Sequence, residues 1–163
     1  MKDFYKQILN DVAVELTDEF DRNFERRAFF DKKWRQTKLI NRRGSILQRS
    51  GRYRRSIQSR VGSHTVHWVS SAPYSSIQNE GGEIIVTDRM KKYFWAMYIR
   101  AGKTGIEAEQ FKAMALKPVG SKITIPERRV IGDHPEVKRA IERCADATFK
   151  EIEEFLKNQL KQR

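Results

Sequence analysis

The stretch SKITIPERRVIGDHPEVKRAIERCADATFKEIEEFL, residues 121–156, contains both kinds of secondary structure that decide the fold. Its first residues alternate between polar and apolar side chains, which predicts a strand that ends at Pro126. Gly132 allows a turn, and Asp133 with Glu136 has the spacing of a helix-capping box. A helix of about 25 residues should follow, because apolar residues recur at helical spacing. These residues are Val137, Ile141, Cys144, Ala145, Ile152, Leu156 and Leu160.

Upstream of this stretch, residues 3–30 are predicted to form another long helix, since an apolar residue recurs at every fourth position. A short helix is expected within residues 72–82, and an aromatic-rich helix at 89–100 with Asp88 as its cap. Three more segments show the short alternating pattern of strands: residues 56–61, 65–70 and 83–87.

The order of these elements predicts an α+β fold, with long N- and C-terminal helices packed on an antiparallel sheet of about four strands. A length of 163 residues fits a single domain, 1–163, that buries a core without cross-links. Two segments are expected to stand apart from this core. They are a basic loop arm at residues 31–55 and a helical insertion at residues 88–120.

The net charge of +12 is concentrated in one segment of the chain. Residues 22–60 hold 14 Lys or Arg and two acids, Glu25 and Asp31, so this segment carries the whole excess of positive charge. Such a block predicts a surface that meets an acidic partner, either nucleic acid or an acidic protein face. The candidate contact residues in the basic arm are Lys32, Lys33, Trp34, Arg35, Lys38, Arg42, Arg43, Arg49, Arg52, Arg54 and Arg55.

No group of side chains predicts a catalytic, metal or cofactor site. His64 and His67 lie three apart on a predicted strand, so they point to opposite faces and do not chelate one ion. Gly81-Gly82 lacks the Lys-Ser or Lys-Thr pair that follows in a phosphate-binding loop. Cys144 has no second cysteine to pair with. We therefore expect a protein that is not an enzyme and needs no cofactor.

The sequence also argues against a membrane protein. It has no apolar run long enough to span a bilayer. Its first 20 residues carry acids throughout and lack the uninterrupted apolar stretch of a secretory signal. We therefore expect a soluble protein with no membrane partner, which acts where it is synthesised.

Four short elements occur in order along the chain: FFDKKWRQTK at 29–38, ILQRSGRYRRSIQSRVG at 46–62, APYSSIQNEGG at 72–82 and ITIPERRVIG at 123–132. Their order and spacing resemble the phage virion morphogenesis family. These are the tail-completion or head–tail joining proteins of Mu-like and related tailed phages and prophages. Two positions depart from the family pattern, because Ser75 stands where Ala is common and Val130 where Phe is common.

The resemblance implies a structural protein that assembles as a closed ring, expected to be a hexamer, at the neck or tail end of the virion. Its expected partners are further copies of itself and other neck or tail proteins, with non-specific contact to the genomic DNA. The expected location is the bacterial cytoplasm during assembly and then the virion. The turns that the resemblance marks as fold-defining are Ser50, Gly51, Gly81, Gly82, Pro126 and Gly132.

Two other classes of protein stay open on the sequence alone. A nucleic-acid-binding protein would use the same basic segment, residues 22–60, although this segment has no helix-turn-helix or zinc-finger pattern. A metal-dependent nuclease would need clustered carboxylates, and the nearest approach is Glu80 and Glu83 near Lys91. For the basic arm we favour contact with a neighbouring subunit over contact with DNA.

Overall fold

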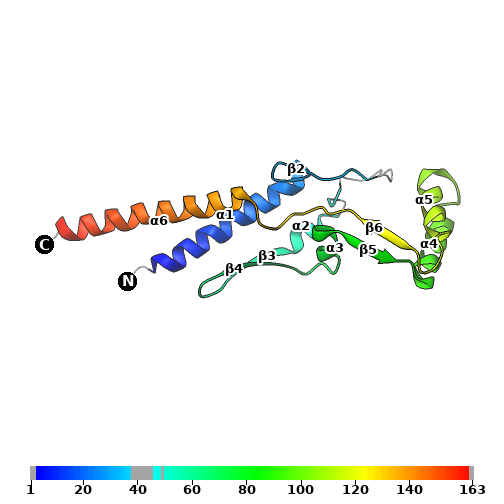
Figure 1. Cartoon of the computed structure of the whole chain (residues 1–163), viewed down its shortest axis with the longest axis horizontal. Helices are drawn as coiled ribbons and strands as arrows, with labels where there is room; N and C mark the ends of the chain where they lie inside the picture. Colours follow the sequence, from blue (N-terminus) through cyan, green and yellow to red (C-terminus); the bar gives the residue numbers. More distant parts are fainter. Residues whose placement is uncertain (1–2, 38–45, 49, 162–163) are drawn as a thin grey trace.

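The computed structural model describes residues 3–37, 46–48 and 50–161 of the chain. Its helices and strands confirm the α+β class, and the molecule is elongated, with two long helices at one end and two shorter ones at the other (Figure 1). The helices are α1 (Phe4–Arg26), α2 (Arg52–Ser56), α3 (Ser75–Glu80), α4 (Asp88–Arg100), α5 (Gly105–Ala115) and α6 (Pro135–Lys161). The strands are β1 (Ala28–Phe29), β2 (Lys32–Lys33), β3 (Ile57–Val61), β4 (Val66–Ser70), β5 (Gly82–Ile85) and β6 (Lys122–Ile125).

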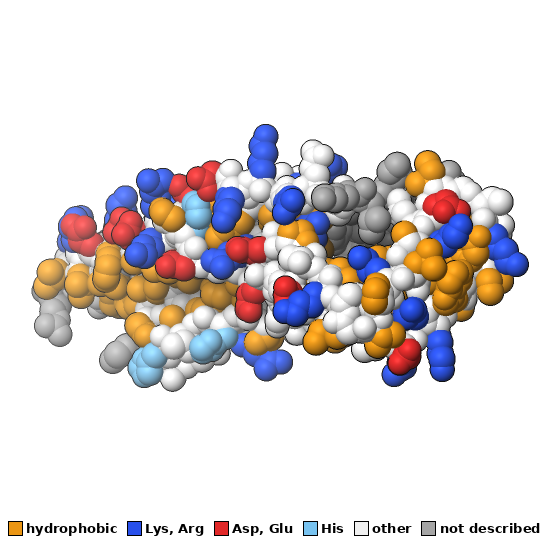
Figure 2. Space-filling model, turned by 45° about the vertical axis from the view of Figure 1, so that its right-hand side comes forward, with side chains coloured by type: hydrophobic (Ala, Val, Ile, Leu, Met, Phe, Trp, Pro, Cys, Tyr) orange, Lys and Arg blue, Asp and Glu red, His pale blue; other side chains and the backbone are white. Residues whose placement is uncertain are grey.

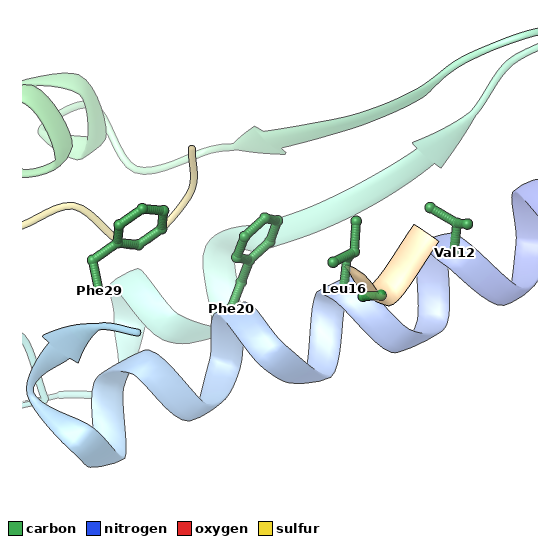
Figure 3. Close-up of a cluster of buried hydrophobic side chains, with 5 residues drawn as sticks. Val12, Leu16, Phe20 and Phe29 are labelled. Atoms are coloured by element: carbon green, nitrogen blue, oxygen red, sulfur yellow. The ribbon is translucent and has the colours of Figure 1, made fainter. Parts of the chain in front are cut away.

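The two long helices, α1 and α6, lie side by side and form one end of the molecule, which we call the stem (Figure 1). The apolar stripe predicted for α1 is buried in the first core cluster, where it faces the β3–β4 hairpin (Figure 3). Trp68 of β4 packs edge-on against Phe20 with ring centroids 5.3 Å apart, and its indole N–H donates to Thr17 Oγ1 at 2.9 Å. The buried members of this cluster are Val12, Leu16, Phe20, Phe29 and Ala140.

The caps of two helices differ from the prediction by one position. The backbone N–H of Glu136 donates to His134 Nδ1 at 3.2 Å, so His134 caps α6 and the capping box predicted at Asp133 is wrong. Similarly, Thr87 Oγ1 accepts from Met90 N at 3.2 Å, so Thr87 caps α4 instead of Asp88. In both places two adjacent residues are able to cap a helix, and helical periodicity does not choose between neighbours.

The four predicted strands are present, but they pair as two separate antiparallel ladders and not as one sheet. β3 pairs with β4 along the full length of both strands, and β5 pairs with β6 in the same way. α3 lies between the two ladders in the chain, so β5 leaves in a different direction and extends away from the stem (Figure 1). The expectation of a single sheet of about four strands is corrected accordingly.

The β5–β6 ladder leads to a helical hairpin made of α4 and α5, which lies at the opposite end of the molecule from the stem (Figure 1). We call residues 88–120 the tip. The two helices hold each other through their apolar sides, where Phe94 stacks on Phe111 with ring centroids 6.4 Å apart. The tip adds no residue to either buried core cluster of the described chain, so it packs mainly on itself.

Candidate functional site

The four sequence elements that resemble the family meet in one place in the structure. Segment 126–132 runs past the end of α1, past α3 and past the residues that follow β2. Its backbone is held there by the side chains of Asn23, Trp34 and Asn79. We call this segment and the three side chains the joint.

Asn79 of α3 makes the largest number of contacts in the joint. Its Oδ1 accepts hydrogen bonds from Val130 N at 2.8 Å and Ile131 N at 3.1 Å. Its Nδ2 donates to Ile131 O at 2.9 Å. One side chain therefore satisfies three backbone groups of an extended segment that no strand pairs with, which is what a buried segment of this kind requires.

Asn23 and Trp34 hold the same segment from the other side. Asn23 is fully buried, and its Nδ2 donates to Val130 O at 3.0 Å while its Oδ1 accepts from Phe30 N at 3.0 Å. The indole N–H of Trp34 donates to Arg129 O at 2.8 Å. These bonds tie the end of α1 to the segment that precedes α6, so the joint fixes how the two long helices leave the core.

A second core cluster surrounds the joint and draws one residue or more from each family-like element. Phe24 packs edge-on against both Trp34 and Tyr53, with ring centroids 6.0 Å and 5.5 Å apart. Burial raises the pKa of Tyr53 to about 12, so its hydroxyl stays neutral at physiological pH. The buried members are Phe24, Trp34, Tyr53, Ala72 and Val130. Val130, the departure from the family's Phe, lies fully buried in this cluster.

Backbone geometry explains two glycines of the family-like elements, Gly51 and Gly81. Gly81 has φ 75° and ψ −174°, and a Cβ there would lie 2.8 Å from Glu127 N and 3.0 Å from Ile125 O. Gly51 has φ 63° at the start of α2, where Ser50 Oγ accepts from Arg52 N at 3.3 Å. Both positions need backbone angles that residues with a side chain rarely adopt. These two glycines therefore determine the direction of the chain and have no chemical role.

Two residues of the basic arm, Trp34 and Arg54, are not available to a partner in the way that the sequence indicates. Trp34 is buried in the joint, so its side chain is not part of an outer contact surface. Arg54 forms ion pairs with Asp21 and, at 2.9 Å, with Glu25, and these hydrogen bonds raise the pKa of Arg54. Arg54 therefore binds α2 to α1 and leaves little net charge for a partner.

Five predicted contact residues of the basic arm are exposed in the described part of the chain: Lys32, Lys33, Arg35, Arg52 and Arg55. Lys32 and Lys33 border a surface hollow that is also lined by Glu127 and Asp133, so acids lie beside these two bases. Arg55 Nη2 donates to Ser50 O at 2.7 Å. The predicted residues Lys38, Arg42, Arg43 and Arg49 lie outside the described residues.

The sequence analysis missed the two asparagines of the joint and the exposed apolar surfaces at both ends. Asn23 and Asn79 gave no signal, because an isolated Asn within or beside a helix has no distinctive pattern. Figure 2 shows hydrophobic side chains along the stem and again over the tip, where Lys and Arg side chains lie among them. The most exposed are Leu160, Val14, Leu116, Ile99 and Phe149.

Neither a metal site nor a membrane span is seen in the parts of the chain that the structure describes. In these parts no three His, Cys, Asp or Glu side chains gather in a way that could hold a metal ion. Of the helices described, none is both long and apolar enough to cross a membrane.

Comparison with known proteins identifies the family of this chain. No curated protein and no solved structure matches the chain. The sequence profile of the phage virion morphogenesis family matches residues 3–150, which include α1, the joint and most of α6. The chain therefore belongs to the phage virion morphogenesis family.

Proposed function

We propose that the protein is a structural ring subunit at the neck or tail end of the virion, where it completes the tail or joins it to the head. Membership of the virion morphogenesis family supports a structural role in phage assembly. The proposal adds the ring, expected to have six copies, and its position. Other neck and tail proteins would contact its two faces, and the genomic DNA would pass through its centre.

The observation that carries the proposal is the shape of the chain and the distribution of its apolar surface. The core lies in the middle of an elongated molecule, while exposed apolar side chains extend along the stem at one end and the tip at the other (Figures 1 and 2). Monomeric soluble proteins rarely expose large apolar patches. Two such patches at opposite ends suit a subunit that contacts a neighbour on either side, as in a closed ring.

The joint supports the same proposal, because it gives the subunit a fixed shape. Three side chains hold one segment to α1, α3 and the residues after β2, so the stem and the β5–β6 ladder leave the core at set angles. A ring closes only if each subunit keeps the same angle between its two contact surfaces. The exposed bases of the arm would then face a neighbouring subunit or the DNA.

The experiment is to delete the coding sequence from the phage or prophage that carries it and to image the particles by electron microscopy. The proposal predicts filled heads and tails that stay separate, or tails with abnormal ends, and complete particles when the protein is supplied from a plasmid. Normal infectious particles in the absence of the protein would contradict it. A defect confined to head filling would also contradict it, since that places the protein before the joining step.

A nucleic-acid-binding role is the second candidate, and the five exposed bases of the arm favour it. Phosphate contacts of this kind weaken steeply as salt rises. The described acids Asp21 and Glu25 count against it, because they neutralise Arg54. Tight binding of a DNA duplex by the monomer, lost when Arg52 and Arg55 are changed to Ser, would favour this role over the ring.

A further inference from the structure

α6 exposes an apolar stripe beside the residues that pack toward α1, and two members of the stripe, Ala145 and Ile152, are half-buried. Ile141, Phe149, Leu156 and Leu160 are 41%, 59%, 53% and 74% exposed, and together with Ala145 and Ile152 they recur every three or four residues. This spacing places all six on one face of the helix. Next to the stripe lie residues that pack toward α1: Thr148 is fully buried, and Phe155 contacts Phe4 with ring centroids 6.0 Å apart. We call the six residues the α6 stripe.

α4 exposes an apolar surface of a different kind at the tip. Trp95 and Ile99 are 38% and 60% exposed, and because they lie four residues apart they are neighbours on the outer face of α4. Lys92 is exposed one turn before Trp95 on the same face. Phe94, by contrast, stacks on Phe111 of α5 and holds the hairpin together. We call Lys92, Trp95 and Ile99 the tip face.

The two ends of the molecule carry opposite net charge. The tip, residues 88–120, has seven Lys or Arg and three Asp or Glu, a net charge of +4. The stem helices α1 and α6 together have twelve Asp or Glu and nine Lys or Arg, a net charge of −3. This negative charge lies on α1, because α6 has six acids and six bases. Charge complementarity of this kind steers association and suppresses contacts between like surfaces.

We propose that the tip face of one copy docks on the α6 stripe of a second copy. This contact deepens the proposed ring function, on which it rests, by naming the two surfaces that join neighbouring subunits. An exposed Trp beside an aliphatic residue is a common anchor at protein interfaces, and the α6 stripe offers a long apolar surface on the stem, whose net charge is opposite to that of the tip. Tip-to-tip and stem-to-stem pairing would each place like charges together. The contact is therefore heterologous, and it can repeat around a ring.

Two variants of the full chain test the two surfaces one at a time. The tip variant carries Trp95→Glu and Ile99→Glu, and the stem variant carries Phe149→Glu and Leu156→Glu. All four side chains are exposed, so both variants should keep the wild-type circular dichroism spectrum and melting temperature within a few degrees. The control is Val14→Glu, since Val14 is 65% exposed on α1 and belongs to neither the tip face nor the α6 stripe.

The measurement is the solution mass by sedimentation velocity across a concentration series. Each of the two variants should associate at least about 30-fold more weakly than the wild type, the effect expected for a hot-spot residue. The control should assemble like the wild type. An equimolar mixture of the tip and stem variants should give a heterodimer, because one copy still offers an intact α6 stripe and the other an intact tip face. At the concentration where the mixture forms this heterodimer, each variant alone should stay mainly monomeric.

Other outcomes overturn the inference in different ways. If both folded variants assemble like the wild type, the tip and the α6 stripe are not the joining surfaces, although the ring function stands. If only the stem variant fails and the mixture gains no heterodimer, the stems pair with each other. A wild type that stays monomeric at every concentration also overturns the inference, while the particle morphology described above tests the ring function independently. If the protein is a monomer that binds DNA, and Trp95→Glu abolishes this binding, then the tip is a nucleic-acid-binding surface and not a subunit contact.

Discussion

Gly81 is the residue whose backbone most clearly requires glycine. Its angles, φ 75° and ψ −174°, lie in a region that other residues rarely adopt, and an added Cβ would meet backbone atoms of Glu127 and Ile125 at 2.8 Å and 3.0 Å. Backbone atoms cannot move aside as a side chain can. We predict that Gly81→Ala lowers the free energy of unfolding by about 3 kcal/mol or more, measured by urea denaturation.

A second glycine provides a matched control for this prediction. Gly102 also has a positive φ of 77°, but no atom lies within 4 Å of the position of its Cβ. Gly102→Ala should therefore lower the free energy of unfolding by only about 1 kcal/mol, the cost of the left-handed backbone alone. Equal effects of the two substitutions would show that the close approach at Gly81 does not matter.

Asn79 gives a prediction about the joint. Removal of its side chain leaves Val130 N, Ile131 N and Ile131 O without their partner in a buried region. We predict that Asn79→Ala lowers the free energy of unfolding by about 2–4 kcal/mol. Asn158→Ala, at an exposed position of α6, should change it by less than about 0.5 kcal/mol. A small effect at Asn79 would mean that water replaces these bonds and that the joint is not rigid.

Tyr53 gives a prediction about pH. Its pKa is about 12 in the folded protein, raised from 10.0 by burial, so the unfolded chain releases this proton at a lower pH than the folded chain does. The stability that follows from this difference is complete below pH 10 and is lost as pH rises from about 10 to about 12. Tyr53→Phe should show a shallower loss of stability than the wild type in this window, measured by thermal melts. Parallel pH profiles of the two proteins would contradict the assignment.

At the scale of elements, the long helices were predictable and the pairing of strands was not. The spacing of apolar residues is local, so it predicted the helices α1 and α6 and the buried stripe of α1, whereas much of the apolar stripe of α6 is exposed. Which strands pair depends on α3 and on the turn at Gly81, which no alternating pattern encodes. Two separate ladders and a single sheet have the same sequence pattern.

In the candidate site, too, the sequence did not predict which charged and aromatic side chains are exposed. Counting charges along residues 22–60 could not reveal that Arg54 pairs with Asp21 and Glu25, because these acids come from α1 and meet Arg54 only in the fold. Trp34 in a basic segment looked like a contact residue, yet its partners are Phe24 and Arg129 O in the core. The sequence pointed to the right elements, but not to which of their side chains are exposed.

The tip gives a prediction at this scale, because it is an element that the core does not need. Val86 N donates to Ser121 O at 2.8 Å, so the two ends of the tip are already paired and a two-residue Asn-Gly turn can join them. Replacement of residues 87–120 by Asn-Gly should leave the free energy of unfolding within about 2 kcal/mol of wild type, measured by urea denaturation. A chain that no longer folds would show that the tip is part of the core.

At the scale of the whole molecule, one end carries apolar side chains with a net positive charge and the other carries them with a net negative charge. A subunit of this kind can join its neighbours in one direction only. In the proposed ring, the joint between the two ends would set the angle at which each neighbour follows. Family membership, the elongated shape and the two surfaces thus lead to a single account of the protein as a building block of the virion.

The most direct test of this account is electron cryomicroscopy of the assembled phage particle, with the structure fitted into the neck and the tail end. We predict a closed ring of six copies at one of these places, each with its tip against the stem of the next copy. A particle that contains no ring of this protein at the neck or the tail end would contradict the account.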